Sequence, residues 1–255
     1  MLLAVDVGNT QTHIGAFRDD ELVEHWRFTS ARDSTADELG VLLRNLLALR
    51  AMTFDDLDGS IVSSTVPRLG VEWSSMAARY LDHPMVVVGP GVRTGMPIRI
   101  DNPRELGADR LVNAIAAYER IGGPCIVIDF GTAITFDAVS AQGEYLGGII
   151  APGAEISLEA LIERAEKLPQ IDLGEPRSLI GKSSVDAIRS GMVYGFAGLV
   201  DGIVTRLRAE LGEKAGTVAT GGLAGAVFPF TETIDEADDL LTLTGLRLIY
   251  ERHEA

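Results

Sequence analysis

The chain has 255 residues, of which 46% are hydrophobic and 23% are charged, an ordinary globular composition for one or two domains. Its net charge of −15 argues against nucleic acid as a partner, because phosphate backbones are bound by clustered Lys and Arg. With a single cysteine, the chain can form no internal disulfide, and a reducing compartment fits. Cys125 stands in an apolar run, so we expect a buried side chain rather than a nucleophile.

The chain begins with a predicted meander of three strands. The first apolar run ends at Asp6 and has no basic flank, which indicates a strand rather than a signal peptide. A turn after Asp6 and another at residues 18–21 separate it from two further strand-like runs. No stretch approaches the roughly 18 uninterrupted apolar residues of a membrane span. We therefore expect a soluble, cytoplasmic protein with no membrane partner.

Helical and strand-like patterns then alternate. Apolar residues at three- and four-residue spacing predict a helix over residues 35–50, with Ser34 or Thr35 as its cap. Short strands at residues 61–64 and 85–88 flank a helix near residues 71–81, and another helix spans about residues 108–120. This alternation indicates an α/β fold with central parallel pairing.

The second half repeats the first. Residues 126–139 again form an apolar strand, an Asp-x-Gly turn with a threonine and a second strand, and a third strand follows at residues 145–150. A long helix is predicted over residues 185–211 and a strand over 217–220, whereas the acidic run at 235–239 is expected to be solvated surface. The repeat predicts two duplicated lobes, residues 1–114 and 115–255, each a mixed sheet flanked by helices, with a nucleotide cleft between them. Accidental similarity of two α/β half-domains is the alternative.

The turn after Asp6 has the residue types of a phosphate-binding loop. Gly8 lets the backbone approach a phosphate closely, while Asn9 and Thr10 add neutral donors. Asp6 can hold Mg²⁺ or a water bound to it. A purely structural hairpin would need the glycine and asparagine but not the aspartate.

The segments at Asp129 and at Gly221-Gly222 extend this pattern to the second lobe. Asp129, Gly131 and Thr132 repeat the order of the first turn, and two such turns suit the β- and γ-phosphates of a nucleotide. Gly221 and Gly222 follow a strand, where they allow an adenine or ribose to lie against the backbone. A plain strand-to-helix turn is the alternative for this glycine pair.

The acid–base candidate is Asp109. Gly107 allows a close approach just before the predicted helix, so Asp109 and Arg110 fall in its first turn beside free N–H groups. Complementarity to the helix dipole alone would also favour an aspartate at this position. The four histidines are scattered without metal-ligand spacing, and neither a nucleophile elbow nor a Walker A lysine motif is present.

Taken together, these segments resemble the type III pantothenate kinase family of the actin/hexokinase/Hsp70-like superfamily. The resemblance covers nearly the whole chain and arrives in family order. The matching strings are DVGNTQTHIG at 6–15, SSTVP at 63–67, GVRTG at 91–95, DNPRELGADRLVNA at 101–114, DFGTAITFD at 129–137, GGIIAPG at 147–153, GKSSVDAIRSG at 181–191 and ATGGLA at 219–224. GADR together with DFGTAIT is the most specific combination.

The resemblance implies ribonuclease-H-like (actin-like ATPase) lobes and ATP-dependent phosphorylation of pantothenate, the first step of coenzyme A biosynthesis. It implies Asp109 as general base, Mg²⁺ with ATP, and a monovalent cation, K⁺ or NH₄⁺, at Asp129. It also implies a homodimer that completes the pantothenate site at its interface. With the glycine pair added, the expected ATP-binding residues are Asp6, Val7, Gly8, Asn9, Thr10, Gln11, Thr12, His13, Thr132, Gly221 and Gly222. The expected substrate-binding residues are Gly107, Ala108, Asp109, Arg110 and Ser184.

Two positions depart from the family pattern. Ile100 stands where many members have a tyrosine, nine residues before the base, so one expected hydrogen bond to substrate is absent. Ser184 replaces a threonine but keeps the hydroxyl. Two other functions stay open: a superfamily enzyme with different chemistry, such as a sugar or acetate kinase or a polyphosphate phosphatase, and a catalytically silent nucleotide-binding regulator. The GADR segment disfavours the former, and the retained aspartates disfavour the latter.

Overall fold

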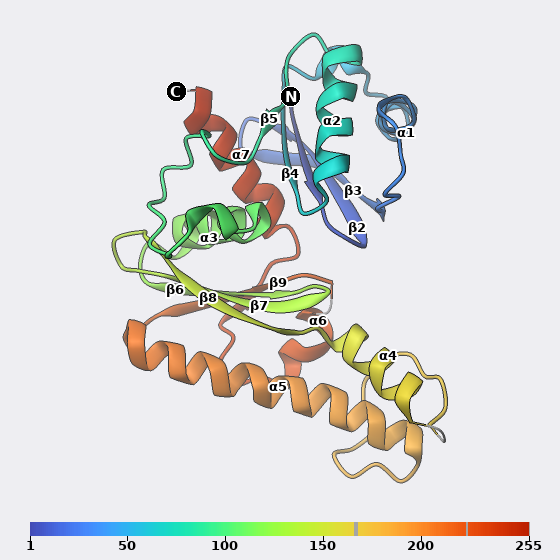
Figure 1. The fold of residues 1–255 in the computed structure, drawn as a ribbon, viewed down its shortest axis with the longest axis vertical. Coiled ribbons are helices and arrows are strands. Elements are labelled where there is room, and N and C mark those ends of the chain that lie inside the picture. Colours follow the sequence, from blue (N-terminus) through green and yellow to red (C-terminus); the bar gives the residue numbers. More distant parts are fainter. Residues whose placement is uncertain (166–167, 223, 255) are drawn as a thin grey trace. The chain divides into compact units, whose positions relative to one another are not determined.

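The computed structural model describes residues 1–165, 168–222 and 224–254, and its contacts divide the chain into two compact units (Figure 1). The first unit consists of Met1–Met96, Asp101–Ala116 and Leu241–Ala255. The second consists of Pro97–Ile100 and Ala117–Leu240.

The first unit has a five-stranded mixed sheet in the order β3-β2-β1-β4-β5. The first three strands form the predicted antiparallel meander, and β4 and β5 add to it in parallel. The bounds are β1 (Leu2–Val7), β2 (Gln11–Arg18), β3 (Glu21–Thr29), β4 (Gly59–Ser64) and β5 (Val86–Val87).

Helices α1 (Ala36–Ala48) and α2 (Pro67–Tyr80) cover one face of this sheet. Thr35 caps α1 through a capping box with Glu38, because each side chain accepts from the other residue's backbone N–H. The core between helices and sheet consists of apolar side chains that repeat every second residue in β1 and every third or fourth in α1. Among its members are Leu3, Val5, Val7, Leu39, Leu43, Leu47, Trp73 and Met76. Each fully buried side chain of this size contributes roughly 1.5–3 kcal/mol.

Helix α7 (Leu241–Glu254) contacts β1, β2 and β4 of the same unit. Gly15 and Gly59 make this packing possible, since a Cβ on Gly15 would lie 3.0 Å from a Leu243 methyl and one on Gly59 would lie 2.2 Å from the Tyr250 hydroxyl. Helix α3 (Ala108–Ile121) is buried along Leu111–Ala117 and crosses the boundary between the units at residues 116 and 117.

The second unit has a five-stranded mixed sheet in the order β10-β9-β6-β7-β8. Strands β6, β7 and β8 form an antiparallel meander, while β9 and β10 join β6 in parallel. The bounds are β6 (Cys125–Phe130), β7 (Ala133–Val139), β8 (Tyr145–Pro152), β9 (Gly216–Thr220) and β10 (Glu236–Ala237). Its helices are α4 (Ala154–Arg164), α5 (Ser184–Leu211) and α6 (Ala224–Val227). Single 3-10 turns lie at Phe54–Asp56, Pro103–Glu105 and Phe228–Phe230.

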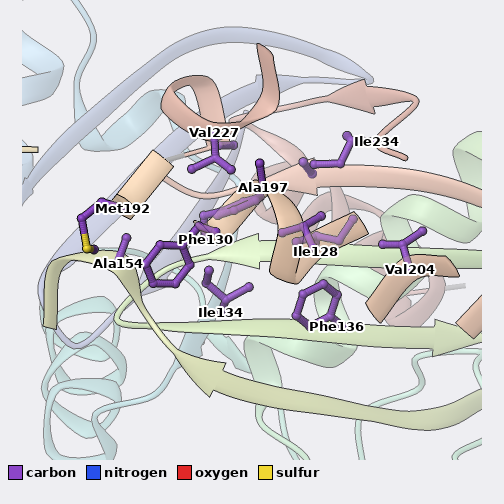
Figure 2. Close-up of a cluster of buried hydrophobic side chains, with 14 of the residues drawn as sticks. Ile128, Phe130, Ile134, Phe136, Ala154, Met192, Ala197, Val204, Val227 and Ile234 are labelled. Carbon is purple, nitrogen blue, oxygen red and sulfur yellow. The ribbon is translucent and has the colours of Figure 1, made fainter. Parts of the chain in front are cut away.

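The core of the second unit lies between β6, β7 and α5. Figure 2 shows Ile128, Phe130, Ile134 and Phe136 of the sheet gathered with Met192, Ala197 and Val204 of α5. By length and hydropathy α5 is one described helix that could cross a membrane, which the sequence analysis did not anticipate. Its buried side chains instead pack on the sheet, as in the core helix of a soluble protein.

The two sheets have the same strand order and the same strand directions, position by position. Asp6 pairs with Ser63 and His13, and Asp129 pairs with Thr220 and Thr135 at the equivalent places. The predicted α/β fold with duplicated ribonuclease-H-like lobes, each a mixed sheet flanked by helices, is therefore confirmed.

Two features differ from the sequence analysis. The helix α7, assigned above to the C-terminal half, groups with the first unit because its apolar face packs on β1 and β4. The acidic run at 235–239 is more than solvated surface. Within it β10 pairs with β9, Asp235 accepts hydrogen bonds from Thr217, and Asp238 pairs with Arg120 at 2.8 Å.

Candidate active site

The first Asp-x-Gly turn joins β1 to β2 in the first unit. The Gly8 N–H donates to the Gln11 carbonyl at 3.0 Å, and a Cβ on Gly8 would lie 2.7 Å from that oxygen. Ser30 holds the turn from the end of β3: its hydroxyl donates to the Gly8 carbonyl at 2.7 Å and its N–H to the Thr10 carbonyl at 2.9 Å. The turn is therefore fixed without a ligand, and its three residues 8–10 lie outside the strands.

Asp6 lies at the end of β1, beside β4. The Ser63 hydroxyl donates to its carboxylate at 2.6 Å. Burial raises the pKa of Asp6 to about 7, although the Ser63 donor lowers it, and the charge of Asp109 raises it further. Asp6 and Asp109, which are 103 residues apart in sequence, therefore act on each other within the first unit.

His13 pairs with Asp6 across β1 and β2. Burial lowers the pKa of His13 to about 4, and the positive charges of Arg27 and His25 lower it as well. The imidazole is consequently neutral at pH 7 and can donate one hydrogen bond and accept another.

The remaining predicted residues of this turn divide into exposed and buried ones. Asn9, Thr10 and Gln11 are exposed. Val7 is a core side chain, and the Thr12 hydroxyl is buried against the Ser30 hydroxyl at 2.8 Å. At Val7 and Thr12, therefore, only backbone groups are available to bind a nucleotide.

Arg32 is a residue of this region that the sequence analysis missed. Its guanidinium donates to the side-chain oxygen of Asn9, and it is exposed. A single arginine on the segment before α1 matches no sequence motif for phosphate binding. Only the folded chain brings it to the turn. It adds a positive charge next to a predicted phosphate loop in a strongly anionic protein.

Asp109 is half-buried in the first turn of α3, as predicted. A Cβ on Gly107 would lie 2.5 Å from a carboxylate oxygen of Asp109, so the glycine is required for this arrangement. Burial raises the pKa of Asp109, while the N–H and the charge of Arg110 lower it. Ala108 and Arg110 flank it and are also half-buried. A raised pKa makes this carboxylate a stronger proton acceptor than a carboxylate in water.

The second Asp-x-Gly turn joins β6 to β7 in the second unit. The Gly131 N–H donates to the Ala133 carbonyl at 3.1 Å, and Gly131 and Thr132 are exposed. Gly153 packs on this turn: a Cβ there would lie 2.2 Å from the Thr132 carbonyl oxygen and 2.6 Å from that of Gly131. Asp129 is partly exposed at the end of β6.

Gly221 lies next to Asp129 in the same unit. It has a φ of +93°, and a Cβ there would lie 2.6 Å from a carboxylate oxygen of Asp129 and 2.7 Å from the Phe130 carbonyl oxygen. The glycine thus leaves room beside two oxygen atoms. Gly222 follows it and is exposed, whereas Leu223 lies outside the described residues.

Ser184 and Ile100 both belong to the second unit. Ser184 is the first residue of α5 and is exposed, and the neighbouring Ser183 caps the helix by accepting from the Asp186 N–H at 3.1 Å. Ile100 is half-buried, with its Cγ2 3.5 Å from the position of a Cβ on Gly147.

Solved structures with the same arrangement come from proteins of diverse names. A Campylobacter jejuni protein whose name assigns it to the Baf family of transcriptional activators aligns with a TM-score of 0.61 and 17% identity over 99% of this chain and 98% of its own. Component A of the Acidaminococcus fermentans (R)-2-hydroxyglutaryl-CoA dehydratase aligns with a TM-score of 0.54 and 15% identity over 98% and 96%. At such identities these likenesses concern the fold alone.

Sequence relatives are much nearer. The Moorella thermoacetica type III pantothenate kinase is 53% identical over 253 residues, covering 99% of this chain and all of the relative. The proteins of that name from Streptomyces avermitilis and Myxococcus xanthus are 52% and 49% identical, over 99% and 100% of this chain and 98% and 100% of theirs. The family model described as type III pantothenate kinase matches residues 2–206. With this match and these full-length identities, the chain belongs to the type III pantothenate kinase family.

Proposed function

We propose that this protein transfers the γ-phosphate of ATP to the primary hydroxyl of pantothenate, giving 4'-phosphopantothenate, in the first step of coenzyme A biosynthesis. The relatives named type III pantothenate kinase, at about half identity over the whole chain, support this reaction. The structural observation that carries it is Asp109, a half-buried carboxylate of raised pKa that lies near the first Asp-x-Gly turn in one unit.

In this proposal the nucleotide phosphates are bound mainly by backbone N–H groups. The first turn contributes residues 6–13 and the second contributes Thr132, with Gly221 and Gly222 for the adenosine part. Neutral N–H donors suit a chain of net charge −15, because its own carboxylates would otherwise repel the nucleotide. Arg32 beside Asn9 adds a cation that neutralises phosphate charge.

Asp109 is proposed to accept the proton of the attacking hydroxyl as its oxygen bonds to phosphorus. Gly107 and Ala108 are proposed as backbone contacts of the substrate, and Arg110 is proposed to bind an oxyanion of substrate or phosphate. Ser184 is proposed as a further substrate contact. Ile100 cannot supply the hydrogen bond that a tyrosine would, so the substrate must be held by its other contacts.

The residues present fit the two ions that such a kinase uses. Asp6 presents a carboxylate oxygen at the first turn, the ligand type that Mg²⁺ prefers, directly or through water. At Asp129, Gly221 leaves room beside a carboxylate and a carbonyl oxygen, which are the donors that K⁺ or NH₄⁺ takes. Both ions, when bound, neutralise the charge of the transferring phosphoryl group.

A homodimer that completes the substrate site is also proposed, in the cytoplasm. The second unit carries exposed large apolar side chains on β8, α4 and the segment before α5, namely Leu146, Ile150, Ile156, Leu161, Leu179 and Ile180. On α5, a Cβ on Gly191, Gly195 or Gly198 would meet nothing within 4 Å. Such a surface is suited to burial against a second copy.

The test is ADP release from the purified full chain with ATP and Mg²⁺, with and without pantothenate, and in K⁺, NH₄⁺ or Na⁺ buffers. Pantothenate-dependent turnover establishes the reaction, and its dependence on K⁺ or NH₄⁺ supports the ion site at Asp129. Sedimentation of the same sample measures the oligomeric state. ATP binding without turnover in any of these buffers, from a folded protein, would refute the kinase and favour a nucleotide-binding regulator.

A further inference from the structure

Residues Pro97–Ile100 form a short segment, here called the edge strap, that lies along the edge of the second unit's sheet. The Tyr145 N–H donates to the Pro97 carbonyl at 2.8 Å, and the Arg99 N–H donates to the Tyr145 carbonyl at 2.8 Å. Ile98 thereby pairs in parallel with Tyr145, the first residue of β8. The strap thus satisfies backbone groups of β8 that an edge strand would leave open.

An ion pair fixes the strap a second time. Both Nε and Nη2 of Arg99 donate to one carboxylate oxygen of Glu144, at 2.9 and 2.7 Å. The Arg99 side chain is 61% exposed and that of Glu144 27% exposed. A pair this exposed contributes little to global stability, so its effect is expected to be local.

Tyr145, to which the strap is bound, is itself held by a buried carboxylate. Its hydroxyl donates to Asp137 at 2.5 Å, and both side chains are almost fully buried. The Thr135 hydroxyl approaches the other oxygen of Asp137 at 3.4 Å. Because a buried carboxylate is costly without donors, this network defines the place of Tyr145 closely.

The strap directly precedes the proposed substrate segment. After Ile100 the chain enters residues 101–110, which end with Gly107–Arg110, and Asp109 follows Ile100 by nine residues. Helix α3 holds the far end of this segment, and the strap holds the near end. Between them, Asn102 caps a single 3-10 turn at Pro103–Glu105.

We propose that Arg99, Glu144 and Tyr145 are positioning residues that fix the near end of segment 101–110 for the acceptor alcohol. This inference rests on the proposed function, since it assigns that segment to the acceptor substrate. It predicts that loosening the strap weakens use of the acceptor and leaves ATP binding unchanged, because the residues of the first Asp-x-Gly turn make no part of the strap.

The test compares Arg99→Glu, Glu144→Arg and the double reversal in the full chain. We expect either single change to lower kcat/KM for pantothenate about tenfold, since small misplacements of a substrate site have effects of that order or more. The KM for ATP should stay within about twofold of wild type, and the double reversal should restore the pantothenate value. Arg120→Glu, which breaks the ion pair with Asp238 in the same unit, is the matched control.

Tyr145→Phe removes the hydroxyl that binds Asp137, and Tyr194→Phe is its control because Tyr194 lies on α5, edge-on to Phe230. Equal losses for pantothenate and ATP in Arg99→Glu, or no loss in either, would overturn the proposal. If wild type does not phosphorylate pantothenate, the proposed function fails. Amide hydrogen exchange then tests separately whether the strap orders residues 101–110. Amides of residues 101–110 must then exchange faster in Arg99→Glu than in Arg120→Glu, and equal exchange refutes the strap.

Discussion

The two Asp-x-Gly turns occupy the same place in two sheets of the same strand order, yet different groups hold them. In the first unit the hydroxyl and N–H of Ser30 bind the turn at Gly8 and Thr10. In the second unit Gly153 lies against the turn, with its N–H donating to the Thr132 carbonyl at 3.1 Å. Duplication has therefore preserved the backbone geometry, while the side chains around each turn have diverged.

The divergence gives the two units different chemistry. The first turn has Arg32 beside Asn9 and lies in the same unit as Asp109. Helix α3, after the fifth strand of the first unit, has Asp109 in its first turn, whereas α7, after the fifth strand of the second unit, has no acidic residue there. A general base is thus expected from one unit only. Four predictions test this difference between the units.

The largest effect is expected from Asp109→Asn. The amide cannot accept the substrate proton, so turnover should fall about 10²–10⁴-fold while ATP binding is kept. Steady-state kinetics and titration calorimetry measure the two quantities. Asp55→Asn, an exposed carboxylate of the same unit, is the control. Full turnover by Asp109→Asn would remove Asp109 from the role of base.

Gly153→Ala should damage the second turn far more than Ser30→Ala damages the first. The new Cβ would meet a carbonyl oxygen at 2.2 Å, which is expected to cost roughly 3 kcal/mol of unfolding free energy. Ser30→Ala removes two hydrogen bonds of its hydroxyl and should cost about 1–2 kcal/mol. Denaturant unfolding measures both, with Gly123→Ala as control because that position has open space. Equal costs would mean that the two turns are held alike.

Arg32→Ala should weaken ATP binding about tenfold without weakening adenosine binding, because Arg32 is proposed to act on the phosphates alone. Calorimetric titration with both ligands separates the two contributions. Arg68→Ala, which removes another exposed arginine of the first unit, should bind ATP as wild type does. Loss of adenosine binding in Arg32→Ala would point to a folding defect instead.

The smallest effect expected in wild type is a change of stability with pH that comes from Asp6 and His13 of the first unit. Asp6, with a pKa raised to about 7, stabilises the fold most at low pH, and this stabilisation is lost as pH rises from about 4 to 7. His13, with a pKa lowered to about 4, acts in the opposite direction, and its contribution is lost as pH falls from about 6.5 to 4. Asp109, whose pKa burial also raises, acts in the same direction as Asp6, so His13 offsets part of the combined slope of the two carboxyl groups.

Single substitutions expose the two slopes. Relative to wild type, the slope of unfolding free energy against pH between about 4 and 6.5 should become more positive in Asp6→Asn and more negative in His13→Gln. In the second unit the equivalent pair is Asp129 and Thr135, which has no imidazole. Parallel pH curves for both variants and wild type would show that neither group is perturbed in solution.

The sequence by itself determined the strands, the turns and most helices, because these depend on neighbours close along the chain. The alternation of apolar residues and the two Asp-x-Gly turns predicted both meanders within a residue or two of their bounds. Of the two caps predicted for α1, Ser34 and Thr35, the structure has Thr35. The place of Asp109 in the first turn of α3, just after Gly107, was predicted for the same local reason.

Only the tertiary structure decided which distant segments meet. The packing of α7 on β1 and β4, the pairing of β10 within an acidic run, and the binding of the edge strap to Tyr145 join residues tens to hundreds of positions apart. The raised pKa of Asp6 likewise depends on burial and on Ser63 and Asp109. Such contacts follow from the fit of whole faces and from the desolvation they impose, and no local pattern of residues encodes either one.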